Sequence, residues 1–307
     1  MPTNSSPKTR TTPSRETLAP SISDTIQIYK RMRRLILLFI TLTKISCSGQ
    51  SGDELIFKVQ YKPETKYSQT IVRTSNSNVK YSGSEEFHQK LKEKGIQNPM
   101  IIDKETTIES ILKTGKLSDD STFPLTVEFV KTTGSANKSD IPDGAIIYGH
   151  GSIDSMPTLD SIVSPGLDDE FEKVLLQTMQ STYSQLLFPE QRVKIGDGFS
   201  RVAPLSFPIA GEIIEMTITT DYKLLSITNG IADFDVSQVY IVKSTSTKYP
   251  VKASGSGKGK LLYDVSNKFY LKYQIDIEIA LNLKLEMFDL DSKSRSGFTQ
   301  TTVITTN

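Results

Sequence analysis

The sequence predicts a mainly β protein of the α+β class, built on a large curved antiparallel sheet or half-open β-barrel. Three observations carry this prediction. Apolar and polar residues alternate strictly from Phe269 to Met287, Asn229-Gly230 separates two apolar-patterned runs, and one amphipathic helical pattern ends at Pro189. Alternation with period two is typical of a strand with one buried face.

The segment from Phe269 to Met287 predicts the curvature. Its odd positions are all apolar, whereas its even positions are mostly polar or charged. At about 3.3 Å per residue, an extended segment of this length spans roughly 60 Å. A compact domain of about 250 residues is only about 35–40 Å across. The strand must therefore bend, with its apolar face on the inner side of a curved sheet.

Two long hairpins are expected in the C-terminal half. Glu212 to Thr228 and Ile231 to Val242 flank Asn229-Gly230, which is the strongest short hairpin signal. Lys260 to Val265 and the strand from Phe269 form a second pair, with a turn at residues 266–268. Long C-terminal hairpins are therefore part of the predicted architecture.

The N-terminal half predicts shorter elements. Leu55 to Tyr61 alternates like a strand, and Tyr67 to Val72 can return as a second strand. Ser84 is a candidate N-cap for a helix from Glu85 to Lys94 that Gly95 ends. Val127 to Lys131 is another expected strand.

One long helix is expected to pack against the sheet. Acidic residues 168–170 favour the positive end of a helix dipole, and apolar residues then follow three-four spacing from Phe171 to Leu186. The alternative for this helix is binding to a partner protein.

The N-terminal segment predicts export. Residues 1–31 are rich in Ser, Thr and Pro and are expected to form a disordered leader. Met32 is followed by two arginines and by an apolar run from Leu35 to Thr43, which together resemble a secretory signal over residues 32–46. A start of translation at Met32 would place the basic residues at the terminus, which favours the interpretation that residues 1–31 are not translated. Nine apolar residues rise only about 14 Å as a helix, too little to span a bilayer.

Cys47, the only cysteine, lies directly after this segment. The stretch from Thr43 to Cys47 resembles the lipobox of bacterial lipoproteins, although Lys44 replaces the usual leucine-like residue. The resemblance implies lipid attachment at Cys47, a membrane as partner, and a tether over residues 47–54. The alternative is an ordinary signal cleaved near Ser48.

Composition excludes several function classes. The 36 basic and 35 acidic residues give no reason to expect a nucleic acid partner. One cysteine rules out an internal disulfide and a cysteine-rich zinc site, and two histidines leave little for a histidine metal cluster. We expect no metal and no cofactor. Residues 55–307 form a single β-rich domain, or two lobes over 55–150 and 151–307.

Three chemical motifs fail on their spacing. Gly255 to Lys260 lacks the Gly-Lys-Ser/Thr ending of a phosphate loop and is expected to be a loop or bulge that opens the second hairpin. Asp289 to Lys293 has a cation at a calcium-ligand position. Tyr148 to Ser152, with Asp154 nearby, holds Ser, His and Asp in one expected turn, where they cannot be oriented independently. No catalytic residues are predicted, so the chain is expected not to be an enzyme.

Three segments together resemble an uncharacterised family of bacterial envelope lipoproteins, a domain of unknown function. They are the opening Phe57 to Tyr67 stretch, Pro189 to Phe199 after the helix, and the paired hairpins of Tyr222 to Asp264. Phe199 stands where the family pattern favours tryptophan. The resemblance implies an envelope location and a β-rich fold, and no activity. The long curved hairpins are more loosely similar to the half-barrels of envelope lipoprotein carriers.

These observations predict a lipid-anchored protein of the bacterial envelope, in the periplasm or at the outer membrane. Its curved sheet is expected to offer an apolar face to a lipid, an acyl chain or an apolar peptide, with candidate binding residues Ile275, Ile277, Ile279 and Leu281. Two alternatives remain. The helix from Phe171 to Leu187 covers that face, or the protein is a structural or interaction module that acts through loops such as Ser135 to Gly151.

Overall fold

A computed structural model gives the fold. It describes residues 53–134, 142–164, 166, 169–185, 190–209, 212–242, 251–285 and 288–306. The chain divides into two units, Met1–Gly49 and Gln50–Asn307. The expected leader, the signal segment and Cys47 lie outside the described residues, so their predictions stay predictions.

The described part of the chain is mainly β, with far more residues in strands than in helices. Its thirteen strands are β1 (Glu54–Phe57), β2 (Thr65–Gly83), β3 (Met100–Thr114), β4 (Thr122–Thr133), β5 (Ile146–Ser152), β6 (Thr158–Val163), β7 (Gln191–Lys194), β8 (Gly198–Ile209), β9 (Glu212–Thr228), β10 (Ile231–Val242), β11 (Val251–Asp264), β12 (Phe269–Lys284) and β13 (Phe288–Thr306). The helices are α2 (Glu85–Glu93) and α3 (Asp169–Gln185).

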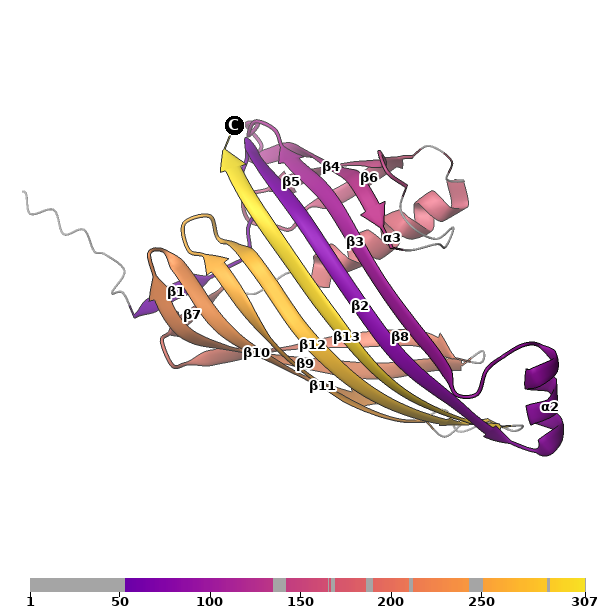
Figure 1. Ribbon diagram of the computed structural model, residues 1–307. Helices are drawn as coiled ribbons and strands as arrows, with labels where there is room; N and C mark the ends of the chain where they lie inside the picture. Colours follow the sequence, from indigo (N-terminus) through magenta and orange to yellow (C-terminus); the bar gives the residue numbers. More distant parts are fainter. Residues whose placement is uncertain are drawn as a thin grey trace, which may run out of the picture. The chain divides into compact units, whose positions relative to one another are not determined.

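Eleven strands form one antiparallel sheet, in the order β6-β5-β4-β3-β2-β13-β12-β11-β10-β9-β8 (Figure 1). The sheet does not close into a barrel. β1 and β7 form a separate two-stranded sheet. The prediction of a large curved antiparallel sheet is therefore confirmed, with β6 and β8 as its two open edges.

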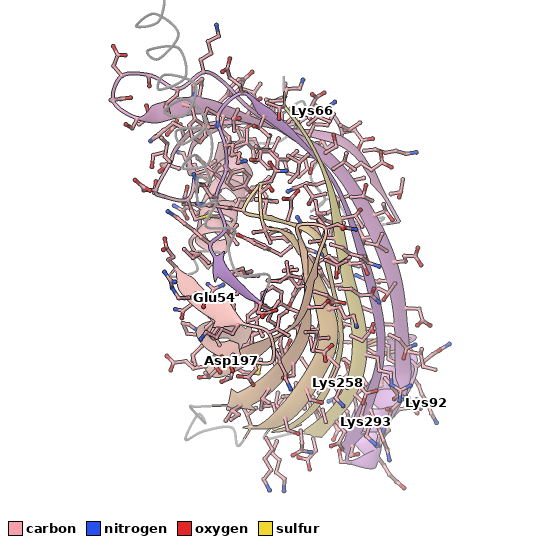
Figure 2. All side chains as sticks on the ribbon, turned by 90° about the vertical axis from the view of Figure 1, so that its left-hand side faces the viewer. Glu54, Lys66, Lys92, Asp197, Lys258 and Lys293 are labelled. Carbon is pink, nitrogen blue, oxygen red and sulfur yellow. The ribbon has the colours of Figure 1, made fainter. Side chains whose placement is uncertain are left out.

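The sheet bends along the length of its strands (Figure 2). Glu54 of β1 lies on the inner side of this arc. Three glycines of β11 pair with isoleucines of β12. Gly255 pairs with Ile279, Gly257 with Ile277 and Gly259 with Ile275. A Cβ at Gly259 would lie 2.0 Å from the carbonyl oxygen of Gln274. Glycine allows β12 to approach this closely, because it presents no side chain.

The structure corrects the interpretation of this glycine-rich stretch. It was expected to be a loop, but all of it lies in β11, which pairs with β12 from Val251 to Asp264. Tyr148 to Ser152 was likewise expected to be a turn and is instead β5. A Cβ at Gly149 would lie 2.3 Å from the carbonyl oxygen of Thr158, so close packing of neighbouring strands explains this glycine too.

The predicted extended segment from Phe269 is confirmed as β12, but the strand is shorter than expected. The strand ends at Lys284 rather than Met287, and the Leu285 N–H donates to the carbonyl of Phe288 in the connection to β13. Its pairing with β11 shifts register at Leu262/Tyr263, where Tyr263 lies opposite Tyr270. The bulge changes the phase of the alternation, so that both Phe269 and Tyr270 are buried.

The two hairpin turns are confirmed. Asn229 and Gly230 join β9 to β10 with φ angles of 52° and 77°, the left-handed values that favour these residues. The turn at residues 266–268 joins β11 to β12, and the Asn267 N–H donates to the Asp264 carboxylate over 2.9 Å.

Both helices lie near their expected positions. Ser84 caps α2 by accepting a hydrogen bond from the Phe87 N–H. The prediction of one long packing helix is not borne out. α3 instead lies beside β6, and the Leu159 N–H of β6 donates to its Gln180 side chain at 2.8 Å. Leu175, Leu176 and Met179 of α3 pack against the main hydrophobic core.

Candidate functional site

The Leu55–Tyr61 segment, which comprises most of β1 and the residues after it, packs on the concave side of the sheet. Alternate residues Leu55, Phe57, Val59 and Tyr61 are buried, the first two at 0% and 1% exposure. The Phe57 ring lies 5.0 Å from Phe199 and 4.8 Å from Tyr263. The sequence predicted this alternation, and the structure shows that it packs inside the sheet's curve.

A cavity of about 350 Å³ remains beside this segment. Residues from seven neighbouring strands of the curved sheet, from β2 to β8, line it, together with β1 and the segment that follows. They are Phe57, Val59, Ile71, Arg73, Arg201, Ala203, Ile218, Thr220, Tyr222, Gln238, Leu261, Tyr270, Tyr273, Phe298 and Gln300. Most of these side chains are apolar or aromatic, with a few polar groups among them, which is the usual make-up of a small-molecule site.

β2 and β8 are six strand intervals apart in the sheet, yet both line this cavity. At about 4.8 Å per interval, these strands would be roughly 29 Å apart in a flat sheet. The curvature is therefore what brings Arg73 of β2 and Arg201 of β8 to one site.

A hydrogen-bonded network around Gln238 supplies polar groups to the cavity wall. The Gln238 side-chain Nε2 donates to the Thr220 hydroxyl at 3.0 Å and lies 3.5 Å from the Tyr273 hydroxyl. The Tyr240 hydroxyl donates to Gln238 Oε1 at 2.6 Å. Bonding to both ends of the amide fixes its orientation, so the wall is ordered before any ligand enters.

Burial controls the ionisation of the phenols in this wall. It raises the pKa of Tyr222 to about 12, although the nearby Arg201 charge works in the opposite direction. Burial also raises the pKa of Tyr273 well above its ordinary value, and the neighbouring phenols Tyr222, Tyr240 and Tyr270 raise it further. These phenols are neutral at physiological pH, because removing a proton would leave a charge in an apolar site.

Two arginines bring positive charge to the cavity. Arg201 is half-buried, and desolvation lowers the pKa of its guanidinium. The Arg73 guanidinium lies 5.7 Å from the centre of the Phe298 ring, a cation–π distance. Among the described residues that line the cavity, none is acidic.

The four residues predicted from sequence lie along β12, outside this cavity. Ile275 is buried in the core, and Ile277 packs against the core from a half-buried position. Ile279 and Leu281 are half-buried farther along the strand. Their cross-strand neighbours on β13 are Ser292, Ser294, Ser296 and Phe298. The apolar stripe is thus narrow at its far end, and its role in binding stays a prediction.

Sequence reasoning missed Tyr270, Tyr273 and both arginines. Tyr273 is one of the apolar odd positions, so it could have been included with the three isoleucines and one leucine predicted from sequence. Tyr270 is an even position that only the bulge turns inward. Arg73 and Arg201 carry no sequence signal, because their meeting depends on the sheet's curvature.

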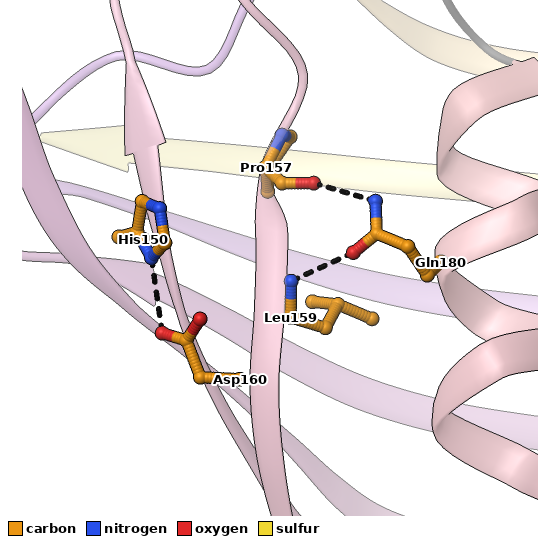
Figure 3. Close-up of polar contacts among 5 residues, drawn as sticks. All are labelled: His150, Pro157, Leu159, Asp160 and Gln180. Atoms are coloured by element: carbon orange, nitrogen blue, oxygen red, sulfur yellow. Dashed lines mark hydrogen bonds and ion pairs between the residues drawn. The ribbon is translucent and has the colours of Figure 1, made fainter. Parts of the chain in front are cut away.

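The Ser-His-Asp grouping of the β5 region separates in the structure. His150 Nδ1 lies 3.0 Å from Asp160 Oδ2 in a half-exposed pair, and Figure 3 shows this pair on the side of β6 away from Gln180. The Ser152 hydroxyl contacts Ser155 instead, and Asp154 pairs with Lys58 at 3.3 Å. The three groups have different partners, so they do not form a relay.

Within the described part of the chain, no three His, Cys, Asp or Glu side chains are placed to hold a metal ion. In the same residues no helix is both long enough and apolar enough to cross a bilayer. No known protein family and no curated protein matches the sequence.

Proposed function

We propose that this chain is an exported, lipid-anchored protein of the bacterial envelope that binds an apolar ligand in the cavity of its curved sheet. The observation that carries the binding proposal is the cavity itself, which stays open beside the buried Leu55–Tyr61 segment. Its ordered polar network and its aromatic wall suit binding of a molecule with a long apolar part.

The volume favours one acyl chain over a lipid with several. Small-molecule sites usually have volumes of roughly 300–1,000 Å³. A cavity of about 350 Å³ is at the lower end of this range. A single chain can lie beside Tyr270 and Tyr273, with the rest of the ligand toward the polar groups.

Export and anchoring rest on the sequence. The basic start, the apolar run and Cys47 have the order of a lipoprotein signal, and the predicted tether ends where β1 begins at Glu54. The resemblance to envelope lipoproteins of unknown function supports the same location.

Ligand binding is tested with the full chain produced in a bacterial host. Native mass spectrometry and solvent extraction identify any bound molecule, and N-phenyl-1-naphthylamine, an uncharged probe, reports cavity access by its fluorescence. Because an attached lipid could be mistaken for a ligand, Cys47→Ser is measured in parallel. Loss of an acyl mass from the N-terminal peptide of this variant supports the anchor, and an unmodified Cys47 in the parent refutes it.

A cavity-filling variant localises the binding. Ala203→Phe places a ring in the cavity and should abolish probe binding, whereas Val202→Phe adds the same ring on the opposite face of β8, where Val202 is 61% exposed. If the parent protein binds no probe, or if both variants bind it equally, the cavity is not the site.

An exposed apolar patch favours a second candidate, a protein-interaction module. Val202 of β8 and Val239 of β10 both pair with Thr219 of β9 and so lie in one row on the convex face. Ile241 follows in the next row at 55% exposure. Exposed apolar patches often mark protein interfaces. Recovery of a stable partner that Val239→Glu releases, without loss of probe binding, would support this candidate.

A further inference from the structure

We infer that the cavity selects a single-chain amphiphile with an anionic head group, which Arg73 and Arg201 recognise from opposite walls. This inference rests on the proposed function, since it names the class of ligand that the same cavity takes.

The first argument is local charge. The whole chain is close to neutral, with 36 basic and 35 acidic residues. The fifteen described residues around the cavity nevertheless include two arginines and no carboxylate. An anion entering this cavity meets only attractive formal charges from its lining, whereas a cation is repelled.

The second argument is the setting of the two cations. Arg201 is half-buried between apolar and aromatic side chains, and desolvation lowers the pKa of its guanidinium, which records the cost of holding this charge away from water. Arg73 lies over the Phe298 ring at the wall of the same cavity. An anionic group between them would offset that cost, because electrostatic attraction strengthens as water is excluded.

The third argument is the mixed chemistry of the wall, which holds both apolar surface and hydrogen-bond donors. Tyr270, Leu261 and Phe57 are buried at 8%, 3% and 1% exposure and offer an apolar surface. The guanidinium groups and the Gln300 amide supply hydrogen-bond donors. A guanidinium can donate two parallel hydrogen bonds to a carboxylate or a phosphate. A ligand with an acyl chain and one such head group matches both kinds of lining group.

The inference is tested by displacement of N-phenyl-1-naphthylamine from the full chain by three C12 compounds: dodecanoate, dodecyl phosphate and dodecanol. They share the chain and differ in the head. We expect at least one anion to bind about tenfold more tightly than the alcohol, since charge-assisted hydrogen bonds are the stronger ones. The tighter of the two anions identifies the head group as carboxylate or phosphate.

Variants assign this preference to the two arginines. The gap is the ratio of the affinity for the anion to the affinity for dodecanol. Arg73→Gln and Arg201→Gln should each reduce this gap several-fold. Arg201→Lys should keep more of the gap than Arg201→Gln does. Arg295→Gln is the matched control. Arg295 is exposed, does not line this cavity, and forms an ion pair with Glu278 at 3.0 Å. Circular dichroism confirms folding of each variant, and the exposed Arg73 provides the test if Arg201→Gln does not fold.

The outcomes separate this inference from the proposed function. Equal binding of dodecanol and both anions, or an unchanged gap in both arginine variants, overturns the anionic head group and leaves apolar binding in place. Failure of the probe to bind at all overturns the proposed function, and this inference with it. A gap that narrows in the arginine variants and persists in Arg295→Gln supports both.

Discussion

The Tyr263 hydroxyl donates a hydrogen bond to the backbone carbonyl of Lys58 at 2.6 Å, across 205 positions of sequence. The same hydroxyl accepts from the Lys58 N–H at 3.3 Å. One phenol of β11 thus satisfies both backbone groups of a residue in the segment that lies inside the sheet's curve. These bonds fix the segment beside the cavity, because Phe57 and Val59, on either side of Lys58, both line it.

Tyr263→Phe should therefore destabilise the domain by about 1–3 kcal/mol, since two partly buried backbone groups lose their partner. Urea denaturation followed by circular dichroism measures the change. Tyr148→Phe is the control, because Tyr148 is 43% exposed on β5. Equal stability of both variants would show that this contact does not hold the segment.

The β11 glycines predict a graded response to alanine. At Gly259 an added Cβ would meet backbone atoms, 2.0 Å from the Gln274 carbonyl oxygen. At Gly257 it would meet only side-chain atoms of Ile275 and Ile277, at 3.1 Å or more. Overpacking typically costs about 1–3 kcal/mol. We expect Gly259→Ala to lie at or above this range in thermal denaturation and Gly257→Ala to cost clearly less. The reverse order would contradict close strand approach as the reason for these glycines.

The sequence predicted the parts of the fold in which apolar periodicity is strong. The hairpin at Asn229-Gly230, the extended β12 and the curvature of the sheet all followed from period-two patterning and turn chemistry. It missed most of β13 and the second half of β2, because serines replace apolar residues there: Ser294 faces Ser77 and Ser296 faces Ser75 across the strand pair. Small polar residues facing each other give no hydrophobic alternation to detect.

The cavity could be predicted only in outline. Ten apolar residues on one strand indicated an inner face, but the open region lies beside Tyr270 and Tyr273 instead of Ile279 and Leu281. Two structural features determine where the cavity lies, and both depend on parts of the chain outside β12. The bulge at β12 turns Tyr270 inward, and the Leu55–Tyr61 segment occupies the neighbouring part of the curve. Neither is written in the pattern of β12 itself.

Gln180 of α3 protects an open edge of the sheet. Its side-chain oxygen accepts from the Leu159 N–H at 2.8 Å, and its Nε2 donates to the Pro157 carbonyl at 3.2 Å, as a neighbouring strand would (Figure 3). Unpaired edge groups are liable to pair with other chains. Gln180→Leu should therefore speed amide hydrogen exchange at Leu159 and raise aggregation. The exposed Gln177→Leu on the same helix is the control. Unchanged exchange at Leu159 in the Gln180 variant would exclude this role.

Alkaline pH should weaken the fold through its buried phenols. Burial raises the pKa of Tyr222 from 10.0 to about 12. A group whose pKa is higher in the folded state contributes stability that is fully present below the unfolded pKa and is lost as pH rises through the folded one. The contribution of Tyr222 is thus complete below about pH 10 and disappears between pH 10 and 12.

Tyr222→Phe should consequently lose less stability over this window than the parent, by on the order of 2 kcal/mol, because each pKa unit corresponds to about 1.4 kcal/mol. Tyr240→Phe should behave in the same direction, since burial raises the pKa of Tyr240 to about 12 as well. Urea midpoints measured at intervals from pH 8 to pH 12 give the comparison, with Tyr148→Phe as the exposed control. If the two buried-site variants follow the parent curve throughout, their phenols do not ionise in this window on unfolding, and the cavity wall is more hydrated than its burial indicates.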